Sequence, residues 1–197
     1  MNIITNNCLG GFIYKDILKE EYQNPFIWTL FDPDEYIDFI DNFDTINFDN
    51  YELIKEGNGL SNNFQLLIDC KYHLKFIHYN FEASADTPYI KGVDVYYNRI
   101  WEYIVEKYIT RLKRMKAQKT TVFIYYEPNL KCSKLSLLPE IIQNHNYKCI
   151  AFTNKLKSTD KLKVYPIEKT WNSPPPVVQT YRKEILEFIN ENSNNND

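Results

Sequence analysis

The chain of 197 residues is long enough for one domain of ordinary size with a buried core. Its composition, 44% hydrophobic and 25% charged, is typical of a folded protein and excludes a disordered one. A net charge of −3 argues against nucleic acid as a partner, because nucleic-acid binders usually carry a basic excess that neutralises phosphates. No apolar run approaches the roughly 18 residues of a membrane span, and the signal-peptide pattern is missing, so we expect a cytoplasmic protein without a membrane span.

Several common functional motifs are absent from the sequence. The 4 cysteines, at positions 8, 70, 132 and 149, form no C-x-x-C pair, which excludes a zinc ribbon and argues against a disulfide framework. The 5 glycines form neither a Walker loop nor a G-x-G-x-x-G fingerprint, and there is no G-x-S-x-G nucleophile elbow. We therefore expect no metal site and no glycine-rich nucleotide loop.

Hydrophobic periodicity and turn residues predict strands that alternate with helices. The run 26–31 is continuously apolar, as in a strand buried on both faces. The next helix begins at Asp32, with Pro33 and Glu35 after it, residue types that favour a helix start. The expected elements are strands at 3–5, 26–31, 51–54, 64–69, 74–79, 121–126 and 148–153, and helices from 12 to 18, from 33 to 43, at 94–116, at 137–144 and at 178–190.

This alternation predicts an α/β fold. We expect a single domain over residues 1–191, in which a mixed β-sheet is flanked by helices in Rossmann-like layers. Residues 170–176 are expected to form a surface linker, and residues 192–197 a disordered tail. Helical spacing places Leu112 and Met115 within about 40° of Tyr108, on the buried face of the longest helix.

The polar turn after the first strand is the first candidate site. It leads into a helix N-terminus, where free N–H groups and the helix dipole favour a negative group. A thiolate at Cys8 would be stabilised there, as in enzymes with a nucleophilic cysteine. Gly10 and Gly11 would let a ligand or a neighbouring strand come close. In the alternative interpretation Asn6 or Asn7 caps the helix, and Cys8 packs as a small apolar residue.

His78 is the second candidate. On a strand it shares a face with Leu74 and Phe76, so it is either a hydrogen-bonded core residue or a general base that takes a proton from an amine or a hydroxyl. His73 lies five residues earlier and points to the opposite face. The two histidines therefore cannot hold one metal ion from a regular strand.

Arg111, at the edge of the apolar stripe of the longest helix, is the third candidate. It either lies over the core or pairs with a phosphate, together with Arg114. The basic residues Lys113, Arg114 and Lys116 also complement the negative end of the helix dipole, which requires no ligand.

The sequence Asp32-Pro33-Asp34 has the D-x-D form with which many glycosyltransferases hold a metal ion and a nucleotide sugar. A helix cap explains Asp32, Pro33 and Glu35 together, so the structural interpretation is favoured.

A set of motifs resembles one protein family. The opening Thr5–Tyr14 is similar to S-N-N-C-x-G-G-x-x-Y, with Thr5 in place of Ser. The likeness runs from residue 3 to about 153 and is to domain of unknown function 1919, a bacterial family often labelled exopolysaccharide biosynthesis protein. The further motifs that keep the family's order are Asn24-Pro25-Phe26, Leu67-Ile68-Asp69, Phe76-Ile77-His78-Tyr79 and Lys107–Met115, with Tyr108 in place of Trp.

The resemblance implies sugar modification in surface-glycan pathways, most directly by a sugar N-acetyltransferase. Its substrates would be acetyl-CoA and the amino group of a nucleotide-linked deoxyamino sugar. His78 would accept the proton of the attacking amine. Cys8 would either form an acetyl-thioester or only line the site, and we favour direct attack by the amine. Backbone N–H groups of residues 7–10 would hold the oxyanion or a phosphate.

Arg111 and Arg114 are expected to bind a phosphate of CoA or of the sugar nucleotide. Two alternatives remain, a metal-dependent glycosyltransferase that uses Asp32 and Asp34, and a non-catalytic module that binds sugar nucleotides. The residues expected to bind the substrate are Asn6, Asn7, Gly10, Gly11, Tyr14, Asp69, Tyr79 and Asn80.

Overall fold

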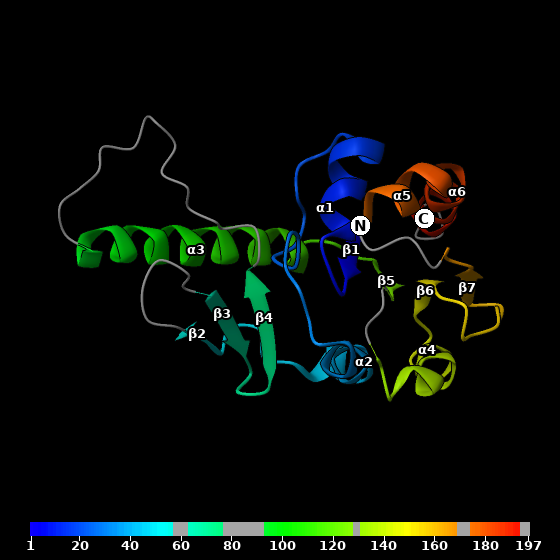
Figure 1. Cartoon of the computed structure of the whole chain (residues 1–197), viewed down its shortest axis with the longest axis horizontal. Coiled ribbons are helices and arrows are strands. Elements are labelled where there is room, and N and C mark those ends of the chain that lie inside the picture. The colour runs from blue at the N-terminus through cyan, green and yellow to red at the C-terminus, as the bar shows by residue number, and fades with distance from the viewer. Residues whose placement is uncertain (57–62, 77–92, 128–130, 169–173, 194–197) are drawn as a thin grey trace.

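Four parallel strands, in the order β1-β5-β6-β7, form the larger sheet of the protein (Figure 1). The structure is a computed structural model and describes residues 1–56, 63–76, 93–127, 131–168 and 174–193. The strands are β1 (Asn2–Thr5), β5 (Thr121–Tyr126), β6 (Lys148–Phe152) and β7 (Leu162–Tyr165). The sequence predicts the first three strands but not β7, whose four residues give a short and weak alternation.

Helices cover both faces of this sheet. Strand β5 shows this, because its successive side chains belong alternately to two buried clusters, one on each face. Ile124 and Tyr126 pack with helices α1, α5 and α6, whereas Phe123 and Tyr125 pack with α2 and α4. The expected layered α/β architecture is therefore confirmed. One layer contains α1 (Leu9–Phe12), the π-helical turn η1 (Ile13–Leu18), α5 (Pro174–Thr180) and α6 (Arg182–Ser193), and the other contains α2 (Pro33–Asn42), η2 (Phe43–Thr45), η3 (Leu135–Leu137) and α4 (Leu138–Asn144).

A second sheet is antiparallel, with the order β2-β3-β4, so the mixed strand directions are divided between two sheets. Its strands are β2 (Tyr51–Glu56), β3 (Asn63–Ile68) and β4 (Tyr72–Phe76). Asp69 and Cys70 join β3 to β4 with φ values of 53° and 54°, the pair of left-handed residues that tight hairpins use. The long helix α3 (Val93–Lys116) buries Tyr108, Leu112 and Met115, as predicted. They belong to the core cluster that contains Phe123 and Tyr125.

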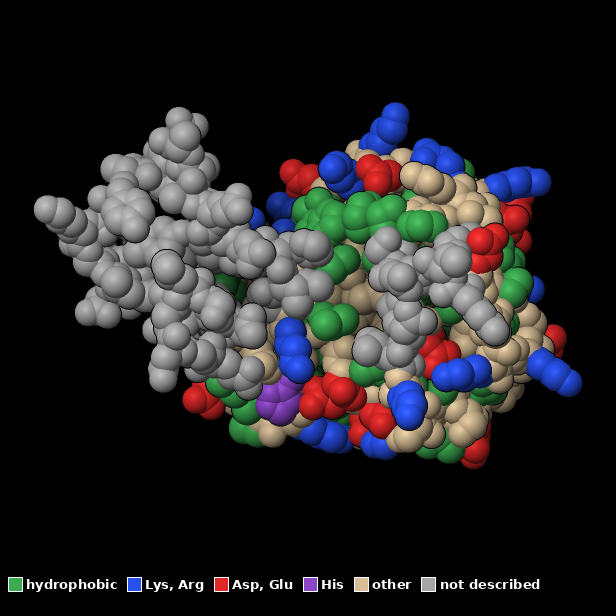
Figure 2. All heavy atoms as spheres, viewed as in Figure 1, with side chains coloured by type: hydrophobic (Ala, Val, Ile, Leu, Met, Phe, Trp, Pro, Cys, Tyr) green, Lys and Arg blue, Asp and Glu red, His purple; other side chains and the backbone are tan. Residues whose placement is uncertain are grey.

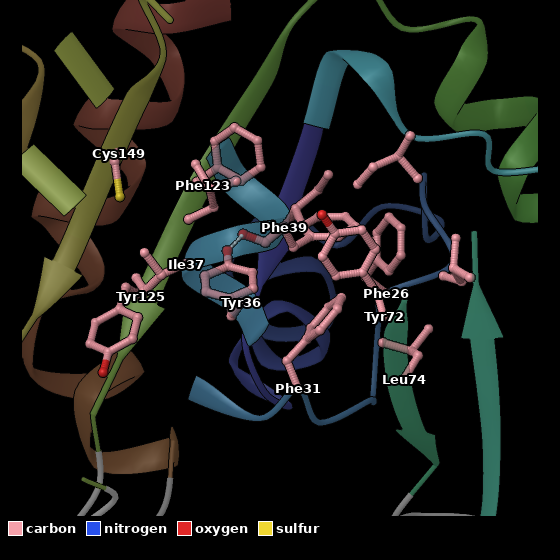
Figure 3. Close-up of a cluster of buried hydrophobic side chains, with 14 of the residues drawn as sticks. Phe26, Phe31, Tyr36, Ile37, Phe39, Tyr72, Leu74, Phe123, Tyr125 and Cys149 are labelled. Atoms are coloured by element: carbon pink, nitrogen blue, oxygen red, sulfur yellow. Dashed lines mark hydrogen bonds between the residues drawn. The ribbon is translucent and has the colours of Figure 1, made fainter. Parts of the chain in front are cut away.

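Helix α2 begins where the sequence predicts. The Asp32 side chain accepts hydrogen bonds from the N–H groups of Asp34 and Glu35, and Pro33 occupies the first helical position. Inside the core, the Tyr36 hydroxyl donates to the carbonyl oxygen of Ile4 at 2.7 Å, and rings from α2, β4 and the preceding segment surround it (Figure 3). This contact ties α2 to β1.

The prediction of a strand at 26–31 is wrong, although the prediction that this run is buried is confirmed. Phe26, Ile27 and Phe31 are buried, but the segment turns instead of extending. Trp28 has φ 63°, and the Thr29 hydroxyl donates to the Phe26 carbonyl at 2.7 Å. A continuous apolar run reports burial and not backbone direction, so this pattern cannot distinguish a buried turn from a buried strand.

Two C-terminal boundaries also differ from the sequence analysis. Helix α5 begins at Pro174, inside the segment 170–176 that was expected to be a linker. Helix α6 continues to Ser193, two residues into the expected tail, and Asn192 is buried with its amide donating to the Phe188 carbonyl at 2.7 Å. Among the described residues, we find no helix long and apolar enough to cross a membrane.

The surface carries both signs of charge. Acidic and basic side chains lie next to one another over α2 and α4 on the face shown in Figure 2, in keeping with the net charge of −3. Hydrophobic side chains gather over α1 on the same face. Half-buried aromatic residues of this region, Phe12 and Trp28, pack edge to face with ring centroids 5.0 Å apart.

We expect Gly11→Ala to destabilise the protein by about 1–3 kcal/mol, because overpacking forces neighbouring groups to shift. A Cβ at this position would lie 2.3–2.6 Å from three ring atoms of Trp28. Gly10→Ala is the comparison variant: its Cβ would lie 3.0 Å from the Thr5 hydroxyl and 3.2 Å from the Thr5 methyl, a less severe overlap that should cost less than Gly11→Ala. Urea denaturation of both variants measures the difference, and equal midpoints would contradict this packing.

Candidate functional site

The candidate site lies at the carboxyl ends of β1 and β5. These neighbouring parallel strands are followed by helices on opposite faces of the sheet. Leu9 of α1 joins one buried cluster, and Leu138 of α4 joins the other. In open α/β sheets, ligands bind outside the carboxyl ends of two strands whose connections leave in opposite directions. This edge of the sheet is therefore where the fold itself favours a ligand.

The Asn6 side chain joins the two strand ends. Its amide nitrogen donates to the Tyr126 carbonyl at 2.9 Å, and its amide oxygen accepts from the Tyr126 N–H at 2.9 Å. The Asn6 carbonyl accepts from the N–H of Phe31, which brings the start of α2 to the same edge. Asn6 is buried, so its contacts position the surrounding elements.

The polar turn after β1 uses its own donors. The Asn7 amide oxygen accepts from the Leu9 N–H at 2.9 Å, and the Thr5 hydroxyl accepts from the Gly10 N–H at 3.1 Å. These partners occupy two of the N–H groups expected to hold an oxyanion or a phosphate. Asn7 thus pairs with the first N–H of α1 from the position before the N-cap, and the N-cap residue, Cys8, makes no side-chain cap hydrogen bond.

Cys8 is buried in this turn, and burial raises the pKa of its thiol to about 12, with a smaller opposing contribution from its own backbone. The expected stabilisation of the thiolate is thus not found, because desolvation outweighs the hydrogen bond from the backbone of Cys8. At neutral pH the thiol is protonated, and a protonated thiol is a weak nucleophile.

The other motif residues of the N-terminal segment also have partners within the fold. Gly11 lies against the indole of Trp28, so a side chain and not a ligand makes the close approach. The buried Tyr14 hydroxyl accepts from the Ile3 N–H at 3.3 Å and donates to the Met1 carbonyl at 3.2 Å. These contacts cover the outer edge of β1, which protects an otherwise open strand.

Three polar residues at this edge were not among the candidates from the sequence. Glu127, directly after β5, is buried, and its carboxylate accepts from the Thr153 hydroxyl after β6 at 2.8 Å. Lys155 forms an ion pair with the same carboxylate at 2.5 Å. The position of Glu127 in the sequence could have indicated its place, because an acidic residue directly after an apolar strand of a parallel sheet lies at the carboxyl edge.

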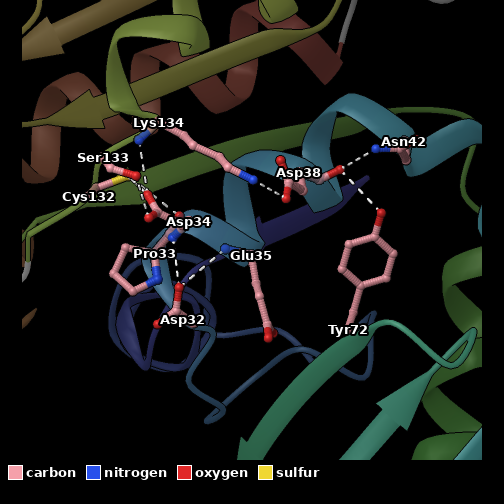
Figure 4. A network of polar contacts seen from close by, with 10 residues as sticks. All are labelled: Asp32, Pro33, Asp34, Glu35, Asp38, Asn42, Tyr72, Cys132, Ser133 and Lys134. Carbon is pink, nitrogen blue, oxygen red and sulfur yellow. Dashed lines mark hydrogen bonds and ion pairs between the residues drawn. The ribbon is translucent and has the colours of Figure 1, made fainter.

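The D-x-D residues lie at the N-terminus of α2 and carry structural hydrogen bonds (Figure 4). Asp32 caps its own helix, whereas Asp34 accepts from the Ser133 hydroxyl at 2.6 Å and from the Lys134 N–H at 3.0 Å. These bonds lower the pKa of Asp34 to about 2. No three His, Cys, Asp or Glu side chains in the described ranges are grouped to hold a metal ion. A glycosyltransferase role would require Asp34 to give up these bonds.

The remaining candidate residues belong to the hairpin of β3 and β4 or follow it in the sequence. His78, Tyr79 and Asn80 lie outside the described residues. β4, which ends two residues before His78, has a bridge from Lys75 to Leu30, next to the segment bonded to Asn6. Asp69 lies at the turn, and β4 separates it from that end by about 13 Å. The structure therefore does not bring Asp69 to the edge that holds Asn6.

Arg111 and Arg114 lie at the other end of β1. Arg114 forms an ion pair with Glu21 at 3.0 Å and donates to the Tyr22 carbonyl at 3.1 Å. Arg111 lies over the Tyr22 ring, 4.9 Å from its centroid. The adjacent Met115 carbonyl accepts from Asn2, the first residue of β1. Both arginines thus secure the segment around Tyr22 and are not brought to the Asn6 edge.

These features define an α/β protein with its candidate site at a switch point of the sheet. Residues 1–98 match the family model described as Domain of unknown function (DUF1919), so the N-terminal half of the chain is similar to that family. The match contains the turn with Cys8, α2 and the hairpin. No curated protein matches the chain.

We expect Cys8 to resist alkylation. Its thiol is buried with a pKa raised to about 12, whereas Cys70 is exposed in the hairpin turn. Peptide mass spectrometry after iodoacetamide treatment at pH 7.5 compares the two sites in one sample. Modification of Cys8 as fast as of Cys70 would contradict the protonated, buried state.

We expect Asp34 to make stability depend on pH in the acid range. Its pKa is lowered from 3.8 to about 2 in the folded protein, so its contribution is present above pH 4 and is lost as the pH falls toward 2. In Asp34→Asn, the free energy of unfolding should fall less steeply over that interval. Urea titrations between pH 2 and 5 measure this slope, and parallel curves for both proteins would refute it.

Proposed function

We propose that this protein is a sugar N-acetyltransferase, which transfers an acetyl group from acetyl-CoA to the amino group of a nucleotide-linked deoxyamino sugar for surface-glycan biosynthesis. The observation that carries the proposal is the switch point between β1 and β5. There Asn6 pairs with Tyr126, and the next residue, Glu127, accepts from Thr153 after β6. The reaction class comes from the family resemblance, which the match over residues 1–98 supports only at the level of the family. The proposed location is the cytoplasm.

The protonated state of Cys8 supports direct transfer over an acetyl-cysteine intermediate. The amine nitrogen attacks the thioester carbonyl, the new C–N bond forms, and the C–S bond breaks. The amine's proton goes to His78, the proposed general base, and the CoA thiolate leaves and takes up a proton. A protonated amine has no free electron pair, so deprotonation must precede or accompany the attack.

The polar residues at the carboxyl edge are proposed to orient the acceptor. Glu127 is held by Thr153 and Lys155, so its carboxylate has a defined position at the end of β5. A carboxylate held in this way can accept hydrogen bonds from sugar hydroxyl or amino groups. Because Arg111 and Arg114 contact the segment around Tyr22, we do not include them in the proposed CoA site.

We expect His78→Ala to lower turnover by about 10² to 10⁴, and Cys8→Ser to retain activity. The assay measures CoA release from acetyl-CoA in the presence of a panel of UDP- and dTDP-linked amino sugars. His145→Ala is the matched control, because His145 contacts Asp41 at the far end of α2 and stacks on Tyr147. Wild-type turnover in His78→Ala would show that His78 is not the general base. An acetyl group found on Cys8 would show that transfer proceeds through an acetyl-cysteine intermediate.

The same panel separates the proposal from its alternatives. A glycosyltransferase that uses Asp32 and Asp34 would release nucleotide from the sugar donor and would be silenced by EDTA. A binding module would bind sugar nucleotides and leave acetyl-CoA intact. Either result would overturn the transferase, and CoA release that persists in EDTA would support it.

A further inference from the structure

Three buried polar atoms make no hydrogen bond of good geometry in the part of the chain that the structure describes: Asn2 Oδ1, Tyr125 OH and Tyr147 OH. Burying a polar group without a partner costs free energy, and folded proteins leave few such groups. Each of them therefore needs a reason. Their positions in the sheet distinguish Tyr125 from the other two.

Tyr125 lies at the carboxyl edge, where the fold favours a ligand. It is the penultimate residue of β5, and Asn6 pairs with the next residue, Tyr126. In Figure 3 its hydroxyl points toward the carboxyl end of β5, away from the aromatic rings of the core. Asn2 and Tyr147, in contrast, lie at the amino ends of β1 and β6.

The surroundings of this hydroxyl suit a group that donates N–H bonds. Burial raises the pKa of Tyr125 well above its usual range, and a hydrogen-bonding contact with the Cys132 side chain and the charges of Glu127 and Asp34 add to this effect. The phenol therefore stays neutral, and its oxygen can accept a hydrogen bond. The ion pair with Lys155 offsets the charge of Glu127. Asp34 accepts from the uncharged Ser133 hydroxyl and Lys134 N–H, and its negative charge repels a phosphate and attracts an amine. The charge of the neighbourhood thus selects between the two polar ends of a nucleotide-linked amino sugar.

We infer that the Tyr125 hydroxyl binds the acceptor's amino group at this switch point, accepting one of its N–H bonds. The inference rests on the proposed function and names the group of the substrate that this part of the site recognises. Tyr125 has 0% exposed surface, so the ligand reaches the hydroxyl by displacing a neighbour. The half-buried Cys132 lies beside the hydroxyl, and its thiol donates to the Asp34 carboxylate at 3.2 Å. Asp34 also anchors this segment through Ser133 and Lys134.

Removing the hydroxyl tests whether it is unpaired in the free protein. We expect Tyr125→Phe to leave the melting temperature unchanged or to raise it by about 2–4 °C. Tyr36→Phe should lower it, because the Tyr36 hydroxyl donates to the Ile4 carbonyl at 2.7 Å. A fall in Tyr125→Phe as large as in Tyr36→Phe would show that the hydroxyl already has a partner, and would overturn the inference.

The binding test compares UDP-glucosamine with UDP-glucose by isothermal titration calorimetry. We expect wild type to prefer the amino sugar, and Tyr125→Phe to lose about tenfold in affinity for it while its affinity for UDP-glucose is unchanged. Tyr147→Phe, which removes a buried hydroxyl at the opposite edge of the sheet, should bind like wild type. Unchanged binding in Tyr125→Phe, an equal loss for both probes, or no preference in wild type would each overturn the inference.

Acetyl-CoA binding in the same variants reports on the proposed function separately. If acetyl-CoA binds but Tyr125→Phe has no selective effect, only the role of Tyr125 is overturned. If the amine preference depends on Tyr125 but acetyl-CoA does not bind, the transferase is overturned and the amine site is retained.

Discussion

The arrangement of the carboxyl edge depends on the Asn6 side chain, which continues the pairing of β1 with β5 after the β1 backbone turns away. Its amide satisfies both the N–H and the carbonyl of Tyr126. Without it these two buried groups would be unpaired, at a cost of about 1–3 kcal/mol each. Since the Asn6 carbonyl also holds the segment before α2, one buried residue positions three elements of the candidate site.

The turn that contains Asn6 is thus mainly a structural element. Thr5 and Asn7 satisfy N–H groups at the start of α1, and Gly11 makes room for the Trp28 indole. Cys8 is desolvated and protonated. The features that suggested an anion site and a nucleophile therefore also build a compact strand-to-helix connection, and the groups that can meet a ligand come from β5 and β6.

The structural turn and the groups that can meet a ligand come from different halves of the sequence. The N-terminal half, which resembles the family, supplies the first strand, its turn and α2. Glu127, Thr153 and Tyr125 lie in the C-terminal half and reach the same edge because the strands are parallel and adjacent. The proposed acceptor site is formed only when both halves are folded together.

The sequence by itself determined the local features: the Asp32 cap, the buried face of α3 and the alternation of strands and helices follow from interactions within a few residues. Only the tertiary structure decided the direction of residues 26–31, the role of Gly11 and the positions of Arg111 and Arg114, since each depends on a partner elsewhere in the chain. The pairing of Asn6 with Tyr126 spans 120 residues, and the surroundings of the buried Tyr125 hydroxyl depend on segments from elsewhere in the chain. Local periodicity carries no information on such long-range contacts, because it reports which side of an element is buried and not what covers it.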